Sequence, residues 1–240
     1  MVLLTKKDQM KYRMLLLAIF LPLVLFANAE TKSERIPVQV KSCRFLVTVP
    51  EGWDTIPHSA FVKKLDEKAV VLALYPKGTE YFEDKYVLLS FQPTVKSLNE
   101  FSFETIVKEL KEMNDKNRKF DSDSIHVIYN GMDTFSNDGK LGVSMSLTVY
   151  NDSSSINCLQ NLLMSKFGYI SITCYNKEQM TSDFEDIVQE IIKGINIDID
   201  YLYIEPQEKS GFTFTNVAIG LGAGILIFLV LMFFENRKKK

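Results

Sequence analysis

The C-terminal part of the sequence contains a long run without charged residues, and this run limits the architecture of the chain more than any other feature. Residues 212–234 contain no Asp, Glu, Lys or Arg, and the six residues after them include Arg237 and three lysines. About 20 apolar residues allow a helix to cross a ~30 Å hydrocarbon core, and Lys and Arg favour the cytoplasmic side. The sequence therefore predicts a transmembrane helix at 212–234 and a basic cytoplasmic tail at 235–240.

The N-terminal segment has the three parts of a secretory signal peptide. Four basic residues precede an apolar run over 14–26, and Ala27-Asn28-Ala29 follows it as a small-x-small cleavage site. We predict a signal peptide at 1–29 that is cut before Glu30. The alternative is an uncleaved anchor, but this apolar run is short for a bilayer and is broken by Pro22. Both ends therefore predict a single-pass type I cell-membrane protein with its ectodomain on the non-cytoplasmic side.

Two glycines in the predicted span have the spacing of a helix-dimer motif. Gly220 and Gly224 form a G-x-x-x-G sequence, and small residues at this spacing let two membrane helices approach closely. Homodimerisation is one interpretation. The other is that glycine is simply frequent in membrane helices.

The segment between the two predicted membrane signals is acidic. Residues 30–211 contain 20 basic and 28 acidic residues, which gives a net charge near −8. This charge makes nucleic acid and anionic lipid surfaces unfavourable partners. We divide the segment into an N-terminal extension at 30–40, an ectodomain at 41–200 and a stalk at 201–211.

The ectodomain alternates between strand and helix periodicities. Strands are expected at 45–49, 70–75, 86–91, 125–135, 141–150, 156–164 and 169–175, the last four as an antiparallel meander with a tight turn at 137–139. Capping boxes at Ser97-x-x-Glu100 and Ser182-x-x-Glu185 precede two amphipathic helices, and residues 197–203 read as an edge strand. Antiparallel connections with two long helices indicate an α+β fold.

The order of these parts resembles the PsbP/Mog1-like family. The resemblance covers about residues 41–195, and it rests on a Phe-x-Val-x-Val-Pro-x-Gly-Trp opening with Phe45, Val47, Pro50, Gly52 and Trp53, on Gly131 and Gly139, on the Phe167-Gly168-Tyr169 turn, and on the helix over 184–195. It implies a central antiparallel sheet with helices on both faces, as an α/β/α sandwich. It also implies a family whose members mostly bind or assist other proteins. The predicted membrane anchor departs from the soluble or lipid-anchored form of many relatives.

The sequence offers little for catalysis or for binding a cofactor. His58 and His126 are far apart, and no Gly-x-Ser-x-Gly elbow identifies a nucleophile. The cysteines form no C-x-x-C pair, and we expect no metal or other cofactor. Trp53 follows a Pro-x-Gly turn and is expected in the core.

The three cysteines leave two interpretations open. Cys158 and Cys174 lie symmetrically about Lys166 in a predicted hairpin, so they could form a disulfide outside the cytosol. They could equally be two small buried thiols. Cys43 would then be either a buried residue or the site of an intermolecular bridge.

These features favour a membrane-anchored, extracytoplasmic binding or assembly module without catalytic activity, whose partner is another envelope protein. The first alternative is a membrane-tethered hydrolase that uses His58 or a pair of carboxylates. The second is a homodimeric membrane organiser driven by Gly220 and Gly224.

Overall fold

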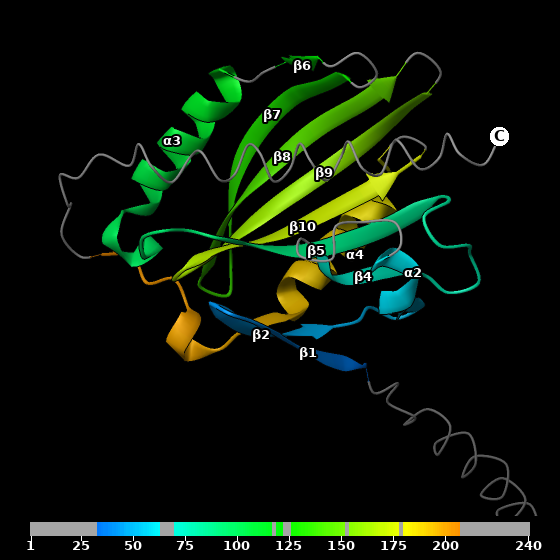
Figure 1. The fold of residues 1–240 in the computed structure, drawn as a ribbon, viewed down its shortest axis with the longest axis horizontal. Coiled ribbons are helices and arrows are strands. Elements are labelled where there is room, and N and C mark those ends of the chain that lie inside the picture. Colours follow the sequence, from blue (N-terminus) through cyan, green and yellow to red (C-terminus); the bar gives the residue numbers. More distant parts are fainter. Residues whose placement is uncertain are drawn as a thin grey trace, which may run out of the picture. The chain divides into compact units, whose positions relative to one another are not determined.

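A computed structural model describes residues 33–62, 70–116, 119–121, 126–151, 154–177 and 180–206. The folded unit begins at Glu34 and consists of antiparallel sheets with few helices, as the sequence predicts (Figure 1). The predicted signal peptide, the predicted span at 212–234 and the tail lie outside the described residues. No helix among the described residues is long and apolar enough to cross a membrane.

The larger sheet has eight strands, and its central part is the predicted meander. Its order in space is β3 (Trp53–Thr55), β4 (Val70–Pro76), β5 (Lys85–Pro93), β10 (Gly168–Asn176), β9 (Ser154–Ser165), β8 (Lys140–Asn151), β7 (His126–Asn137) and β6 (Lys119–Asp121). At the predicted tight turn, Asp138 and Gly139 have φ angles of 49° and 74°. These positive values are the ones that a two-residue hairpin requires.

A smaller sheet contains a strand that the sequence analysis placed outside the ectodomain. It consists of β1 (Arg35–Val40), β2 (Cys43–Thr48) and β11 (Ile195–Ile197). β1 pairs with β2 along its whole length, from Arg35 opposite Thr48 to Val40 opposite Cys43. Residues 35–40 are therefore part of the fold, not an extension.

Among the described residues, three α-helices and two 3-10 helices accompany the sheets. They are α2 (His58–Val62), α3 (Phe103–Lys116), α4 (Ser182–Gly194), η1 (Leu98–Glu100) and η2 (Ile199–Tyr201). The two predicted capping boxes do not form as expected. Ser97 caps η1, whereas Ser102 accepts a hydrogen bond from Thr105 N at the start of α3, and Thr181 precedes α4 without a side-chain cap.

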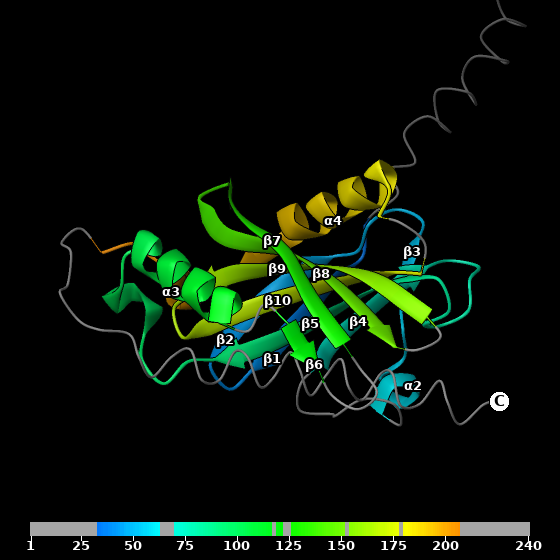
Figure 2. The ribbon, with the colours of Figure 1, turned by 90° about the horizontal axis from the view of Figure 1, so that it is seen from above.

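The central strand β10 packs apolar side chains on both faces of the large sheet, because its successive residues alternate between two cores. Ile170, Ile172 and Cys174 pack with α4 and the small sheet, whereas Tyr169 packs with Ile106 and other residues near α3. Figure 2 shows α4 and α2 on opposite sides of the sheet. Trp53 is buried, as predicted, and stacks on Phe184 of α4 with ring centroids 5.9 Å apart.

Lys140 connects the β7–β8 hairpin to the end of α4. Its side chain is buried, and Nζ donates to the carbonyl oxygens of Ile192, Lys193 and Ile195 at 3.4, 3.2 and 2.8 Å. Burial lowers the pKa of Lys140, and the Asp138 carboxylate opposes this shift. A cation beside the last carbonyls of a helix is also favoured by the helix dipole. No pattern in the sequence around Lys140 predicts this contact.

Candidate interaction surface

Of the two interpretations of Cys158 and Cys174, the structure agrees with two buried thiols and not with a disulfide. In the β9–β10 hairpin Gly168 lies opposite Ser165, so Cys174 lies opposite Leu159 and Cys158 opposite Tyr175. This register is one residue away from the one assumed from the sequence, and a one-residue shift moves a side chain to the other face of a sheet. Cys174 accordingly belongs to the core beneath α4 and Cys158 to the core on the opposite face.

All three cysteines are buried free thiols. Burial raises the pKa of Cys43 to about 11, despite a hydrogen bond with Ser165 that lowers it. Burial also raises the pKa values of Cys158 and Cys174. Because the thiolate is the reactive form of cysteine, none of the three is suited to act as a nucleophile near neutral pH.

The two histidines are not brought together. His58 begins α2 directly after β3, which is one edge strand of the large sheet, whereas His126 begins β7, next to the opposite edge. The His126 ring stacks on Tyr150 with centroids 5.0 Å apart. Within the part of the chain that the structure describes, no group of three His, Cys, Asp or Glu residues could hold a metal ion.

The long strand β7 has an edge that is mostly unpaired. β7 runs for 12 residues, but β6 pairs only with residues 126–128. From Tyr129 to Asn137, β7 pairs with β8 on one side and with no other described strand on the other. The exposed residues along this stretch are Asn130, Gly131, Asp133, Thr134 and Ser136. We call residues 129–137 the open edge of β7.

A β-bulge shapes this open edge. The register between β7 and β8 shifts between Tyr129 and Gly131. Bulges bend and twist a strand, and natural proteins use them on edge strands to limit unwanted pairing. α3 packs on one sheet face beside the edge, where Asn114 Nδ2 lies 3.6 Å from Met132 Sδ. The other sheet face beside the edge is not covered by α3.

The sheet face next to the open edge carries uncharged hydrogen-bonding groups. Asn130 Nδ2 donates to Thr148 Oγ1 at 2.9 Å, and Thr148 Oγ1 donates to Asn157 Oδ1 at 3.3 Å, which links β7, β8 and β9. Two rows further along the same face, beyond the row of Gly131, Ser146 and Leu159, Asp133 lies opposite Ser144, which in turn lies opposite Asn161. Hydroxyl and carboxamide groups both donate and accept, so this face suits polar, uncharged groups of a ligand.

Asn161 ends that row as a buried polar residue. It is fully buried, and neither atom of its carboxamide has a hydrogen-bond partner within the described part of the chain. An unsatisfied buried polar group costs about 1–3 kcal/mol, and native proteins contain few of them. The row from Asp133 to Asn161 therefore differs from an ordinary apolar core, because it contains polar side chains and one of them is buried without a hydrogen-bond partner in the described residues.

Comparisons with known proteins show a similar fold and give no closer relationship. No protein family and no curated protein matches the chain. The matching solved structures include cyanobacterial PsbP (CyanoP) from Synechocystis, with a TM-score of 0.45 and 11% identity over 71% of this chain and 96% of that one. They also include the Ran-binding protein Mog1p from Saccharomyces cerevisiae, with a TM-score of 0.39 and 10% identity over 69% of this chain and 96% of that one. Both structures are similar to this chain only at a distance, and at this level of similarity we carry over no ligand or partner.

The open edge was not found from the sequence, although one local signal was present. The segment Asn130-Gly131-Met132-Asp133 interrupts the alternation of β7, and Gly within a strand often marks a bulge. Which strand lies at an edge depends on pairing between distant segments. That order cannot be read from the pattern of β7 alone.

Proposed function

We propose that this chain is a membrane-anchored, extracytoplasmic binding or assembly module, and that its partner adds an extended segment to the open edge of β7. The observation that carries this proposal is the edge itself, which leaves residues 129–137 with a described strand on one side only. An exposed edge is a template for strand addition, in which backbone hydrogen bonds give affinity and side-chain sites give specificity.

The side chains on the sheet face beside the open edge indicate which kind of partner segment would bind there. Its side chains next to the edge are mainly Asn, Ser and Thr, with Asp133 as the charged group. These groups favour a partner strand with hydroxyl or amide side chains on that face. The net charge of the ectodomain, near −8, favours approach of a basic protein over an acidic one.

The anchoring part of the proposal is supported by the sequence. The uncharged run at 212–234 with its basic tail, and the signal-like segment at 1–29, together favour a single-pass protein whose ectodomain faces away from the cytoplasm. Gly220 and Gly224 would additionally allow two copies to associate in the membrane. Extraction of native membranes at alkaline pH checks the anchor. The full chain should remain with the lipid, and its release would contradict the anchor.

The edge is tested by a pair of adjacent proline variants. Successive N–H groups of a strand point alternately to its two sides, so one of Asp133→Pro and Thr134→Pro removes an outward N–H and the other removes a bond to β8. The variant that loses the outward N–H should leave the domain folded but unable to accept a strand. The variant that loses a hydrogen bond to β8 should have reduced stability, and it serves as the matched control.

Partner capture provides the measurement for these variants. Full-length wild type and both variants are crosslinked in native membranes, the captured proteins are identified by mass spectrometry, and folding is followed by the fluorescence of Trp53. A discrete partner should be lost from the variant that remains folded. Equal capture by a folded edge variant would refute strand addition. Capture of nothing except a second copy would favour the homodimeric interpretation.

A further inference from the structure

Three segments that are distant in sequence converge at the end of the domain where the chain continues toward residue 212. Thr94 N donates to Phe167 O at 2.9 Å, and Leu98 N donates to Lys166 O at 2.7 Å. Lys166 N in turn donates to Tyr201 O at 2.7 Å. We call the surface formed by residues 94–97, 166–167 and 199–206 the stalk end.

The stalk end exposes large aliphatic side chains. Val95 is 90% exposed, Ile199 79% and Ile204 61%. Among the large hydrophobic residues of the described chain, the other exposed ones are Leu46 and Tyr81, at 39% and 40%. Single exposed apolar residues are common, but here the three most exposed aliphatics share one end. Two of them lie in the last segment before the predicted span.

The backbone at this end is held in place, so these side chains do not sit on a frayed terminus. Tyr203 is buried and its hydroxyl donates to Phe101 O at 2.9 Å. Ile204 N donates to Asn99 Oδ1 at 3.1 Å. The aliphatic groups are therefore presented by an ordered surface, which avoids the entropy cost of ordering it on binding.

The acidic groups of the stalk end are engaged by nearby partners. Arg44 lies 3.1 Å from the Asp198 carboxylate and 3.8 Å from that of Asp200. Glu205 Oε1 accepts a hydrogen bond from Phe103 N at 3.1 Å, at the start of α3. Arg44 thus balances one of the two aspartate charges, and the Glu205 carboxylate is held by a backbone N–H at the start of α3.

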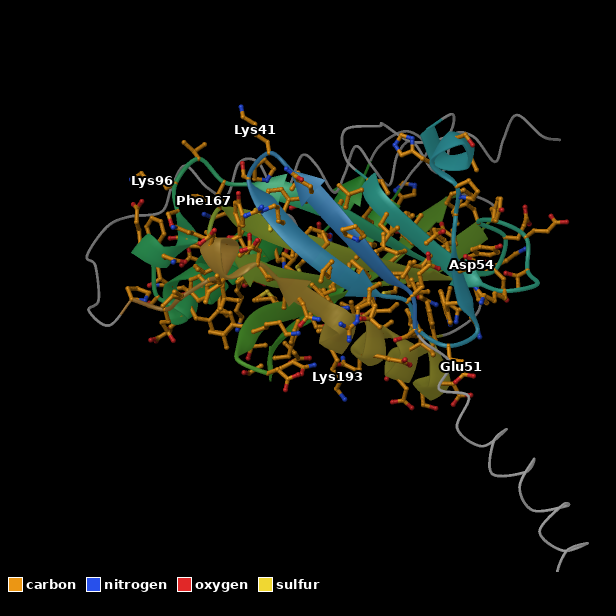
Figure 3. The ribbon with its side chains drawn as sticks, turned by 90° about the horizontal axis from the view of Figure 1, so that it is seen from below. Lys41, Glu51, Asp54, Lys96, Phe167 and Lys193 are labelled. Atoms are coloured by element: carbon orange, nitrogen blue, oxygen red, sulfur yellow. The ribbon has the colours of Figure 1, made fainter. Side chains whose placement is uncertain are left out.

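Basic residues flank the exposed aliphatic groups. Lys96 is next to Val95, and Lys166 Nζ lies 5.1 Å from the centroid of the Phe167 ring. Figure 3 shows Lys41, Lys96 and Phe167 toward one end of the domain and Glu51 and Asp54 toward the other. Long basic side chains next to apolar groups are typical of surfaces at a lipid–water interface, where the charged heads reach the phosphates.

The length of the connecting chain limits how far this end can be from a membrane. Six residue steps separate Pro206 from Phe212, and a fully extended chain covers at most about 3.6 Å per residue, so the connection spans no more than about 22 Å. Ile204 is only two residues before Pro206. If residues 212–234 span a bilayer, the stalk end faces its surface at close range.

We propose that the stalk end rests on the lipid–water interface, with Val95, Ile199 and Ile204 among the headgroups and Lys96 and Lys166 directed to lipid phosphates. This inference rests on the anchor proposed above. The occupant is a phospholipid surface and not a protein, because the connection to the span holds this end beside lipid. Its effective concentration at the membrane is therefore high even if each contact is weak.

Tryptophan reporters in the full-length protein test this orientation. Val95→Trp and Ile199→Trp place a reporter at the stalk end, and Glu80→Trp places one in the loop before β5, at the other end of that strand. Each variant is inserted into phosphatidylcholine nanodiscs with or without brominated lipid, which quenches nearby indoles. The wild type supplies the background, since its one tryptophan, Trp53, is buried.

The expected result is a loss of about half of the reporter emission at positions 95 and 199 in brominated nanodiscs, with little change at position 80 or in the wild type. Adding Ile204→Asp to the Val95→Trp variant should reduce the quenching. Insertion into nanodiscs without quenching at 95 and 199 would overturn the lipid contact but leave the anchor intact. Equal quenching at position 80 would overturn the orientation.

Two further outcomes separate this inference from its alternatives. A full-length chain that does not enter nanodiscs at all would overturn the anchor itself. A photo-crosslinker at position 95 in native membranes should give lipid adducts. Adducts with a protein in place of lipid would overturn the proposed occupant.

Discussion

The buried thiols make the stability of this protein sensitive to alkaline pH. Cys43, Cys158 and Cys174 have pKa values raised by burial from an ordinary value of 9.0. A raised pKa means that the folded state holds the proton more tightly than the unfolded state does. The contribution of each buried thiol to the free energy of unfolding is complete below the pKa of the unfolded state. It is lost as the pH rises from the pKa of the unfolded state to that of the folded state.

The size of the effect follows from the number of thiols. Between pH 8 and pH 10 an unfolded thiol with a pKa of 9.0 ionises almost fully, which lowers the free energy of unfolding by about 1.4 kcal/mol for each thiol that stays protonated in the folded state. With three free thiols, the free energy of unfolding therefore falls by about 4 kcal/mol between pH 8 and pH 10. With a Cys158–Cys174 disulfide, only Cys43 would ionise, and the fall would be about 1.4 kcal/mol.

Urea unfolding of the full-length protein in detergent, followed by Trp53 fluorescence at pH 8 and pH 10 under argon without a reductant, measures this difference. Buried tyrosines such as Tyr86 and Tyr175 also have raised pKa values and add to the loss near pH 10. A variant with Cys158→Ala and Cys174→Ala keeps the tyrosines and isolates the thiols. Its loss of stability between the two pH values should be smaller than that of the wild type by about 2.7 kcal/mol. Equal losses in the two proteins would refute the assignment of buried free thiols.

Two structural substitutions have clear expected outcomes. Lys140→Met removes the donor to the last carbonyls of α4, and it also removes the cost of burying the ammonium group. The loss of the hydrogen bonds should be the larger effect, so the free energy of unfolding should fall by about 2 kcal/mol and the melting temperature by about 4–8 °C. Lys193→Met, at an exposed position, should change the stability little. Gly168→Ala places a Cβ against the carbonyl oxygen of Gln92, so it should cost about 3 kcal/mol in the same thermal melts, while Gly131→Ala, which meets nothing within 4 Å, should be nearly neutral.

The local elements of the large sheet were predictable because their signals lie within each segment. β7, β8, β9 and β10 form the expected meander, and the turn at Asp138 and Gly139 has the backbone that its residues favour. The helix α4 was also predicted, since its apolar residues recur at a helical spacing. In these cases propensity, pattern and turn chemistry agree.

The features that the sequence did not predict depend on pairing between distant segments. In β1 the exposed residues alternate with the less exposed Ile36, Val38 and Val40. Pro37 lies within it, and Pro argues against a strand unless that strand lies at an edge. That β1 is an edge strand follows only from its pairing with β2. The Cys158–Cys174 bridge, one of the two interpretations left open, does not form because the β9–β10 register differs by one residue and places the two cysteines on opposite faces. The donors to the end of α4 come from Lys140, which is 52 residues before Ile192. No window of sequence contains that contact.

The open edge of β7 is better suited to a different protein than to a second copy of this chain. Edge-to-edge pairing of two copies follows a two-fold axis, so each residue meets its symmetric counterpart. An axis at the middle of residues 129–137 would place two Asp133 carboxylates directly opposite each other, and like charges at that position destabilise a strand pair. The bulge between Tyr129 and Gly131 would also have to be accommodated twice. A partner with another sequence can avoid both penalties. If two copies associate through Gly220 and Gly224, the edge of each would remain free for such a partner.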